Sequence, residues 1–322
     1  MKRHICVAVV TRNRPQMLCH LFFSLAVMKR PPEEQLSLLV VENNDKRTLA
    51  GIIEPFRALM LGIKIEYRNE CVPGISAVRN HALNHAIRRG YDLLVYVDDD
   101  ECVEADWLVN LLAERDRLDL DIVGSPVRLK PFARKLTPMQ KLVWRGIAQR
   151  KVKSEQRCKA KCECGRGDTI KLGTGSWMGR LDFFRETGLR FDAQFGLTGG
   201  EDWHLWEKAK SLGARTGWAC NAIVYENVPL SRLTLSYYYR RTRDHNITEF
   251  IASYRENPRK TIRNLPLKLA GRAVKFLSTA IAIPFRGAPG IVSSAAALGG
   301  LVGLMEGPFG KVALHYLETM GF

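Results

Sequence analysis

The chain has 322 residues and is 46% hydrophobic and 25% charged, a composition typical of a folded globular protein and not of a disordered one. Its formal net charge of +16 is concentrated in two stretches: residues 128–171 carry fourteen Lys/Arg and three acids, and residues 229–287 carry twelve and three. We therefore expect anionic partners at particular surfaces, and nucleic acid, an anionic membrane and a diphosphate substrate are the candidates.

Strands and helices are predicted to alternate over the first hundred residues. Strands are predicted at Ile5–Val10, Leu36–Val41, Lys64–Tyr67 and Leu93–Val97. Helices are predicted from Met17 to Leu25, at Ile52–Leu61 and at Ala77–Arg89, the last capped by Ser76. This alternation predicts an α/β fold with a mostly parallel sheet flanked by helices. The loops after the strands meet at one edge of such a sheet, so Thr11, Glu42 and Asp98 are expected to converge.

Three consecutive carboxylates, Asp98, Asp99 and Asp100, follow the strand predicted at Leu93–Val97. That strand delivers them to the carboxyl edge of the sheet, where open α/β folds bind ligands. Acids this close repel one another unless a cation lies among them, and their oxygen atoms suit Mg²⁺ or Mn²⁺. The alternative is a solvated turn, with Asp106 or a neighbour capping the helix that follows.

The pattern changes after residue 121. A strand is predicted at Asp121–Val127, but residues 128–171 show weak periodicity, so we expect an irregular basic excursion or mobile loop there. This stretch holds Cys158, Cys162 and Cys164. Zinc would need a fourth ligand that is not evident nearby, so free thiols are favoured. The eight cysteines show no disulfide-framework spacing and no signal peptide is evident, so a reducing cytoplasm is expected.

A Gly-rich loop, Phe195–Gly200, precedes Glu201 and Asp202, which begin a helix predicted to run to about Leu212. The positive end of a helix favours ionised carboxylates, so Asp202 is expected to be able to accept a proton at neutral pH. The alternative is that the pair is only an acidic first turn.

Two further features accompany this helix. Of Trp203 and Trp206, we expect one to pack in the core and the other to stack on a sugar. A strand is predicted at Ala219–Tyr225, ending in Glu226.

Residues 251–322 are expected to form a helical appendage. Leu267–Phe285 mixes Lys and Arg with large apolar residues, the profile of a basic amphipathic helix. Ala288–Met305 is uncharged over eighteen residues, near the lower limit for a membrane span, but it is rich in Gly, Ala and Ser. We favour an interfacial or self-packing segment, with a core helix pair and a transmembrane helix as the alternatives.

Five motifs carry a family resemblance. They are Thr11-Arg12-Asn13-Arg14-Pro15, Glu42-Asn43-Asn44, Gly74-Ile75-Ser76-Ala77-Val78-Arg79-Asn80, Val97-Asp98-Asp99-Asp100-Glu101 and Gly199-Gly200-Glu201-Asp202. In this order they resemble glycosyltransferase family 2, with its nucleotide-sugar-binding GT-A fold, and most of all its succinoglycan-biosynthesis type from bacterial exopolysaccharide pathways. The resemblance covers about residues 4–250. It implies a GT-A catalytic domain over residues 1–250, including the basic excursion at 128–171, followed by the appendage at 251–322.

The resemblance implies a role for each matched residue. Asp202 would be the catalytic base and Glu201 would orient the acceptor. Asp100 would bind a divalent cation, Mg²⁺ or Mn²⁺, assisted by Asp98. The donor nucleotide would contact Thr11, Arg14, Glu42, Asn44, Arg79, Asp98 and Asp99. Further contacts to the diphosphate or the acceptor are expected from Glu226, Trp203, Arg240 and Arg241.

The chain departs from the family pattern at three places. The family often has Asp where this chain has Glu42, whose side chain is one methylene longer. It sometimes has a metal-binding His where this chain has Glu226. The Gln-x-x-Arg-Trp sequence of processive synthases is absent, and Tyr237–Arg241 occupies that region. Single-sugar addition is therefore expected, not polymerisation.

The implied activity is metal-dependent inverting transfer of one sugar from a UDP-sugar to a saccharide acceptor in bacterial surface or exopolysaccharide synthesis. The basic regions and the apolar tail fit an acceptor linked to polyprenyl diphosphate at an anionic membrane surface. The expected location is cytoplasmic and peripheral, on the inner face of the cell membrane. No specific nucleic-acid partner is expected.

Two other classes of protein remain as alternatives. A nucleotidyltransferase on a related sheet also uses clustered aspartates and metal, but it should have a Gly-rich loop after the first strand, and Thr11–Pro15 contains no glycine. A nonenzymatic nucleic-acid-binding protein would fit the net charge, but no recognition motif supports it.

Overall fold

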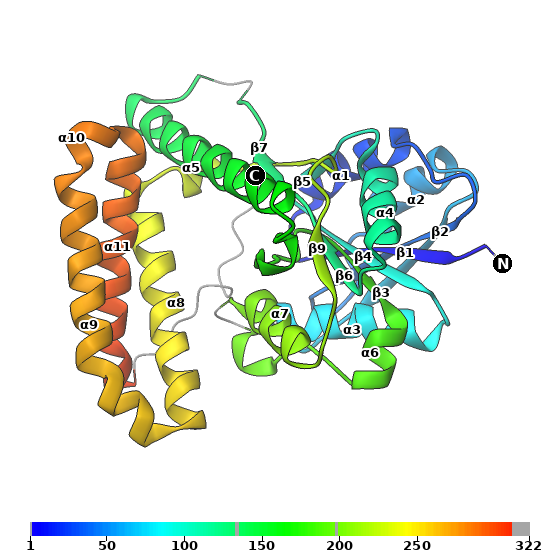
Figure 1. The fold of residues 1–322 in the computed structure, drawn as a ribbon. Coiled ribbons are helices and arrows are strands. Elements are labelled where there is room, and N and C mark those ends of the chain that lie inside the picture. The colour runs from blue at the N-terminus through cyan, green and yellow to red at the C-terminus, as the bar shows by residue number, and fades with distance from the viewer. Residues whose placement is uncertain (1, 133–134, 197–198, 311–322) are drawn as a thin grey trace.

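The computed structural model describes residues 2–132, 135–196 and 199–310. Figure 1 shows a sheet flanked by helices and, beside it, a group of long C-terminal helices joined to it through α5 and α8. The α/β class, the mostly parallel sheet with flanking helices and the C-terminal helical appendage are thereby confirmed.

The central sheet has seven strands in the order β3-β2-β1-β4-β8-β6-β9. They are β1 His4–Thr11, β2 Gln35–Glu42, β3 Lys64–Asn69, β4 Leu93–Asp98, β6 Ile122–Gly124, β8 Ser176–Arg180 and β9 Thr216–Trp218. Strands β1 to β4 are parallel, whereas β8 runs antiparallel to both of its neighbours. Strands β1, β2 and β4 are buried along almost their whole length, which is why each reads as a continuous apolar run.

The register of the strands brings the predicted loop residues to one edge. Thr11 pairs with Glu42 across β1 and β2, and Val10 pairs with Asp98 across β1 and β4. The expected convergence of Thr11, Glu42 and Asp98 is therefore confirmed for the backbone.

Helices cover both faces of the sheet. They are α1 Pro15–Val27, α2 Ala50–Leu59, α3 Ile75–Arg88, α4 Trp107–Leu118, α6 Leu181–Thr187 and α7 Glu201–Ser211. One apolar core joins α1, α2 and α4 to the sheet, and a second joins α3, α6 and α7 to its other face. The expected capping of α3 by Ser76 is wrong, because the helix begins after Gly74 and the Ser76 hydroxyl donates to the Asp192 carbonyl at 2.7 Å.

A second, three-stranded sheet corrects two strand predictions. Its strands are β5 Glu101–Val103, β7 Val127–Leu129 and β10 Val224–Glu226, in the order β5-β10-β7. The strand expected at Asp121–Val127 is divided between the two sheets, and Ser125 and Pro126 separate its parts. The strand expected at Ala219–Tyr225 is limited to β10 at its C-terminal end.

The irregular excursion expected at residues 128–171 is also wrong. After β7, the chain forms the 26-residue helix α5, Pro138–Glu163. Thr137 and Gln140 close a capping box at its start, and Pro138 occupies a first-turn position where the missing N–H costs nothing. Only Val143, Gly146 and Ile147 of this helix are buried, so its apolar residues are too few to predict a helix from sequence periodicity.

Within the described residues, four helices form the C-terminal appendage, the first of which begins before residue 251: α8 Leu235–Glu256, α9 Pro258–Ile281, α10 Ile283–Arg286 and α11 Ala288–Glu306. Helix α11 packs against α8, α9 and α5. Its glycines allow this close approach, because a Cβ atom at Gly299 or Gly303 would overlap the carbonyl oxygen of Tyr239 or Arg243 on α8. Ala288–Met305 therefore packs against other helices of the same chain, in line with the favoured expectation of a self-packing segment.

Ala288–Phe309 is, within the described residues, the one helical stretch long and apolar enough to cross a membrane, and 44% of its apolar window is buried inside the protein. Core helices of soluble proteins pass the same test, so length and composition alone do not make it a span. The domain division expected at residue 250 falls inside α8, which is continuous through that position, and the division stays a prediction. Residues 311–322 of the expected appendage lie outside the described residues.

Candidate active site

A cavity of about 580 Å³ opens at the carboxyl edge of the central sheet, with walls from α3, α5, α7 and the start of α8. Predicted site residues that line it are Thr11, Arg14, Arg79, Asp98, Asp99, Asp100, Asp202, Trp203, Glu226 and Arg241. The fold thus brings together residues that are more than two hundred positions apart in the sequence. The two acidic motifs, at residues 98–100 and at residue 202, face the same space.

Asp99 is held in place by the first strand and the loop after it. The Thr11 hydroxyl donates to one carboxylate oxygen of Asp99 at 2.7 Å, and Arg14 donates to the other at 2.9 Å. Burial raises the pKa of Asp99, and the Arg14 charge and the Thr11 hydrogen bond oppose that shift. Because both oxygens are engaged, Asp99 fixes the positions of Thr11 and Arg14 beside the cavity.

Asp100 lies between two arginines. Arg14 and Arg232 each approach its Oδ2 atom at 3.4 Å, and the Asn227 amide N–H donates to its carbonyl at 2.7 Å. Burial, followed by the nearby charges of Glu226 and Asp99, raises the pKa of Asp100 to about 7. Burial and the neighbouring acids together therefore outweigh the two long arginine contacts of this carboxylate.

Two further acidic side chains, Glu101 and Glu226, lie close to Asp100. Glu101 is only 2% exposed and accepts a hydrogen bond from the Asp98 N–H at 3.1 Å. Burial and the charges of Asp98 and Asp100 raise its pKa well above the ordinary value. Glu226, in contrast, is ion-paired with Lys151 of α5, which holds its pKa below the ordinary value although burial opposes this.

The donor set suits a divalent cation chemically, because crowded, buried carboxylate oxygens with raised pKa values are stabilised by added positive charge. Within the part of the chain that the structure describes, however, no three Asp, Glu, His or Cys side chains come together as a group that could hold a metal. Arg14 and Arg232 take the place of a cation beside Asp100. Metal ligation by Asp98 and Asp100 therefore stays a proposal.

Arg79 of α3 joins the two acidic motifs. Its guanidinium donates to Asp98 at 3.1 Å and forms a buried ion pair with Glu201. Burial raises the pKa of Glu201 to about 7, although the Arg79 charge opposes the shift. Glu201 does not line the cavity, so any influence on a ligand would pass through Arg79.

The start of α7 places Asp202 and Trp203 at the cavity. Gly199 and Gly200 precede it with φ angles of 80° and 96°, a backbone region that favours glycine, and a Cβ atom at Gly200 would lie 3.0 Å from the His245 ring. Asp202 accepts a hydrogen bond from the Trp203 N–H at 2.8 Å. Residues 197–198 of the predicted Gly-rich loop lie outside the described residues.

The two tryptophans of α7 have different surroundings, and the expected stacking on a sugar stays a prediction. Trp203 is 49% exposed and lines the cavity, whereas Trp206 packs against the core beneath α7. The Lys171 ammonium lies 5.6 Å from the ring of Trp203 and 5.8 Å from that of Trp206. Trp203 therefore offers an aromatic face beside Asp202.

Three of the predicted contact residues do not line the cavity. Glu42 is fully buried, and its carboxylate accepts hydrogen bonds from Thr48, Tyr67 and Asn44. Asn44 is engaged with Glu42 and with Asn13. Arg240 is exposed on α8, whereas the adjacent Arg241 lines the cavity. The predicted donor contacts of Glu42 and Asn44 stay untested, and their observed role is to hold the loop after β2.

Three residues that line the cavity were not predicted from the sequence: Lys151, Glu101 and Arg232. Glu101 directly follows the three aspartates, so its place in the motif was the available signal. Lys151 can be assigned to the site only if α5 is predicted as a helix, and the capping box at Thr137 and Gln140 is the sequence signal for its start. No sequence signal distinguishes Arg232 from the other arginines around it.

The cysteines that were candidates for zinc are free thiols. Cys158 and Cys162 are half-buried on α5 and pack against the core, and Cys164 is exposed. Burial raises the pKa of the Cys162 thiol to about 12. They form no metal-binding group within the described residues.

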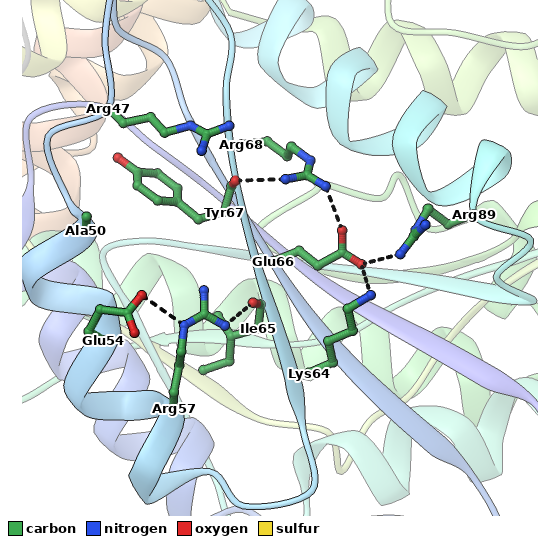
Figure 2. Close-up of a pocket in the computed structure, with 10 residues that line it drawn as sticks. All are labelled: Arg47, Ala50, Glu54, Arg57, Lys64, Ile65, Glu66, Tyr67, Arg68 and Arg89. Carbon is green, nitrogen blue, oxygen red and sulfur yellow. Dashed lines mark hydrogen bonds and ion pairs between the residues drawn. The ribbon is translucent and has the colours of Figure 1, made fainter.

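A second cavity, of about 430 Å³, lies at the outer edge of the sheet on β3 and shares no lining residue with the first. Figure 2 shows basic side chains around it, most of which contact one of two acids, Glu54 or Glu66. Lys64, Arg68 and Arg89 contact Glu66, and Arg57 contacts Glu54. This cavity is therefore a surface ion-pair cluster.

Known proteins are similar to this chain in sequence or in fold. The chain is 27% identical over 311 residues to the succinoglycan biosynthesis protein ExoM of Rhizobium meliloti (strain 1021), and the match covers 94% of each protein. The mannosyltransferase PcManGT from Pyrobaculum calidifontis, solved with GDP-Man and Mn²⁺, aligns with a TM-score of 0.64 and 14% identity over 97% of this chain and 88% of that one.

GalNAc-T7, solved with UDP, GalNAc and Mn²⁺, aligns with a TM-score of 0.51 and 16% identity over 75% of this chain and 48% of that one. At these identities the two solved structures show a shared fold and no more. The family model of glycosyl transferase family 2 matches residues 6–171, which is just over half of the chain. The chain therefore belongs to glycosyl transferase family 2 and is a glycosyltransferase.

Proposed function

We propose that the protein transfers a single sugar from a UDP-sugar to a hydroxyl group of a saccharide acceptor, with inversion at the anomeric carbon. The observation that carries this proposal is the cavity shared by Asp202 and the aspartates at residues 98–100, with Arg79 contacting both Asp98 and the neighbour of Asp202. Glycosyl transfer requires these two functions side by side: a site for the departing diphosphate and a base for the attacking hydroxyl.

The donor binds at the sheet edge in this proposal. Thr11 and Arg14, fixed by Asp99, lie where the nucleoside would enter, and Asp98 faces the ribose or the sugar hydroxyls. Arg232 and Arg241 line the same cavity and supply positive charge for the diphosphate. Arginine suits this task because its planar fork matches phosphate oxygens.

The leaving diphosphate needs its negative charge stabilised. Asp100 and Asp98 would hold the divalent cation, which when bound supplies charge neutralisation to the diphosphate. Arg14 and Arg232 lie 3.4 Å from Asp100, so they can contact either that carboxylate or an incoming phosphate oxygen. Two solved structures of the same fold contain Mn²⁺, one with GDP-Man and the other with UDP and GalNAc, and we propose a divalent cation and a nucleotide-linked sugar for this enzyme by analogy.

The attacking hydroxyl needs a base on the face of the sugar opposite to the diphosphate. Asp202 is partly exposed to the cavity and accepts the Trp203 N–H through one oxygen, which orients the carboxylate. A positioned carboxylate contributes about 10²–10⁴-fold to such a proton transfer. Trp203 provides an apolar face on which an acceptor sugar can stack.

The acceptor in this proposal is a saccharide carried on polyprenyl diphosphate, and the enzyme works at the inner face of the cell membrane. The likeness to ExoM, a protein named for succinoglycan biosynthesis, supports a role in bacterial exopolysaccharide synthesis. The absence of the processive-synthase sequence supports the addition of one sugar for each binding event.

A screen of nucleoside diphosphate release tests the proposal. The purified protein is given Mn²⁺ or Mg²⁺, a water-soluble saccharide acceptor and each of several UDP-sugars and GDP-mannose, and we expect UDP release to exceed GDP release. Asp202→Asn should lower turnover by about 10²–10⁴-fold. Glu207→Gln is the matched control, because Glu207 is an exposed acid of the same helix paired with Lys171.

Full turnover in Asp202→Asn would remove the proposed base, and release of GDP alone would remove the proposed donor. The anomeric configuration of the product, read from its NMR coupling constants, checks inversion independently. Retention of configuration would contradict direct displacement with one base.

A further inference from the structure

The outer face of α9 carries large apolar side chains that nothing in the described structure covers. Leu267, Val274, Leu277 and Ile281 are 78%, 65%, 56% and 72% exposed, and Phe285 of the adjoining α10 is 89% exposed. Their spacing along the chain places them on one face of the helix. Figure 1 shows α9 as the outermost helix of the appendage, with α8 between it and the sheet.

The charges around this face have a single sign. Residues 258–305 contain Arg259, Lys260, Arg263, Lys268, Arg272, Lys275 and Arg286 and no Asp or Glu. Of these cations, Arg272 contacts Glu249 at 3.7 Å, and the others have no ion-pair partner among residues 2–132, 135–196 and 199–310. An exposed apolar face with unpaired cations along it complements a surface that is both apolar and anionic.

A hollow beside the apolar face adds a place for an anion. It measures about 320 Å³ and lies between α8, α9 and α11, with Lys268, Arg272 and Lys275 among its lining residues. Glu249 is the acid that lines it and is already in contact with Arg272. A phosphate group fits the two lysines that remain unpaired.

We propose that the outer face of α9, consisting of Leu267, Val274, Leu277 and Ile281, docks the enzyme onto an anionic lipid bilayer, with Lys268 and Lys275 beside that face, at the hollow shared with α8 and α11. The helix lies in the plane of the interface with its apolar side chains among the lipids and its cations at the headgroup phosphates. This proposal rests on the proposed lipid-linked acceptor and names the surface that brings the enzyme to it.

The charges favour a bilayer over a second copy of the chain. A symmetric dimer through this face would place the same cations opposite one another, with no acid on α9 to offset them. Docking through α9 would also place the active-site cavity near the bilayer. Helix α8 contacts α9 and also supplies Tyr237 and Arg241 to the active-site cavity, so about one or two helix diameters of ~10 Å separate cavity and bilayer.

Vesicle flotation without any donor sugar tests this proposal. Full-length protein is mixed with vesicles of phosphatidylcholine alone or with about one third phosphatidylglycerol, a composition that gives a negative surface. We expect binding to the anionic vesicles, little binding to the neutral ones and weakening at high salt. Leu277→Ser with Ile281→Ser should lower the bound fraction by roughly tenfold or more, because the apolar anchor is lost.

The matched control is Val27→Ser with Leu61→Ser, two residues at the ends of α1 and α2 that are 76% and 74% exposed. This control should bind as the parent does. Lys268→Gln with Lys275→Gln should lose the preference for anionic vesicles and keep its circular dichroism spectrum. No flotation of the parent protein, or equal losses in the α9 and control variants, would overturn the proposal.

Sedimentation velocity without vesicles tests the alternative that the outer face of α9 binds a second copy of the chain. A parent dimer that the α9 substitutions make monomeric, together with absent vesicle binding, would assign this face to self-association. Because flotation needs no sugar transfer, its failure leaves the UDP-release result untouched. Failure of UDP release likewise leaves the docking measurement valid.

Discussion

The α/β part of the molecule and the helices α9 to α11 use charge in opposite ways. In the α/β part, buried or half-buried carboxylates meet arginine or lysine from distant elements, as Glu201 meets Arg79 and Glu226 meets Lys151. On α9 the cations stand on the surface, and most have no acidic partner in the described structure. Substitutions in the first region should therefore affect folding and chemistry together, whereas those on the outer face of α9 should affect neither.

Loss of the buried arginine is expected to have the largest effect on stability. Arg79→Met leaves Glu201 buried without its cation, which should cost about 3–5 kcal/mol of unfolding free energy. Thermal and urea unfolding measure the loss, and Arg117→Met, which removes an exposed pair with Glu114, should change stability by about 0.5 kcal/mol or less. If the double variant Arg79→Met, Glu201→Gln recovers nothing, the two residues are not coupled.

The pH dependence of stability should show the charge of Glu201. Its pKa is about 7 in the folded protein against an ordinary value of 4.5, so the folded state binds more protons between these values and this contribution is lost as pH rises through 7. Between pH 5 and pH 8, Glu201→Gln should gain on the order of 2–3 kcal/mol relative to the parent protein.

Unfolding at both pH values in metal-free buffer measures this gain. Comparing the parent with Glu201→Gln separates the effect of Glu201 from that of histidines such as His245. The pKa of His245 is lowered by burial, so its contribution to stability increases as pH rises, opposite to that of Glu201. Glu207→Gln on the same helix is the control. A stability difference between parent and Glu201→Gln that is the same at pH 5 and pH 8 would show that the folded pKa is ordinary.

Packing in the appendage depends on the close approach of the α11 and α8 backbones and not on charge. Gly303→Val inserts a side chain where the Arg243 carbonyl of α8 already lies, and such overpacking should cost about 1–3 kcal/mol. The melting temperature should fall. Gly271→Ala on α9 meets no atom within 4 Å and should leave it unchanged or raise it slightly. Equal melting temperatures for the parent and Gly303→Val would mean that α8 and α11 are not in close contact.

The smallest effect is expected on the outer face of α9. Leu277→Ser with Ile281→Ser removes side chains that are already in water, so unfolding free energy without lipid should change by about 0.5 kcal/mol or less. Urea unfolding checks this, and UDP release with a water-soluble acceptor should also be unchanged. A large loss of stability would place these side chains in an interior contact and would break the contrast between the two regions.

The sequence determined the central strands and the acids that follow them. Strands such as β1 and β4 are buried on both faces, so each must be apolar along its length, and this leaves an unambiguous pattern. Parallel strands place their carboxyl ends together. The sequence alone was therefore enough to assign Thr11 and residues 98–100 to the same edge of the sheet. The start of α7 at Glu201 was equally readable from the glycines before it.

Helix α5 and the second sheet were not readable in the same way. Most of α5 faces either the cavity or solvent, both of which select polar side chains, so its apolar stripe is reduced to a few residues. Strands β5, β7 and β10 have three residues each, too few for any period to show. Only their hydrogen bonding to one another identifies them.

Which charges meet was decided by the tertiary structure alone. Arg79 and Glu201 are 122 positions apart, and Lys151 and Glu226 are 75 apart, so no local pattern couples either pair. The sequence determines residue type, local conformation and which face of an element is apolar, because these depend on neighbours along the chain. The partner of a buried charge, and whether an apolar helix face is covered or left bare, depend on how whole elements pack against one another.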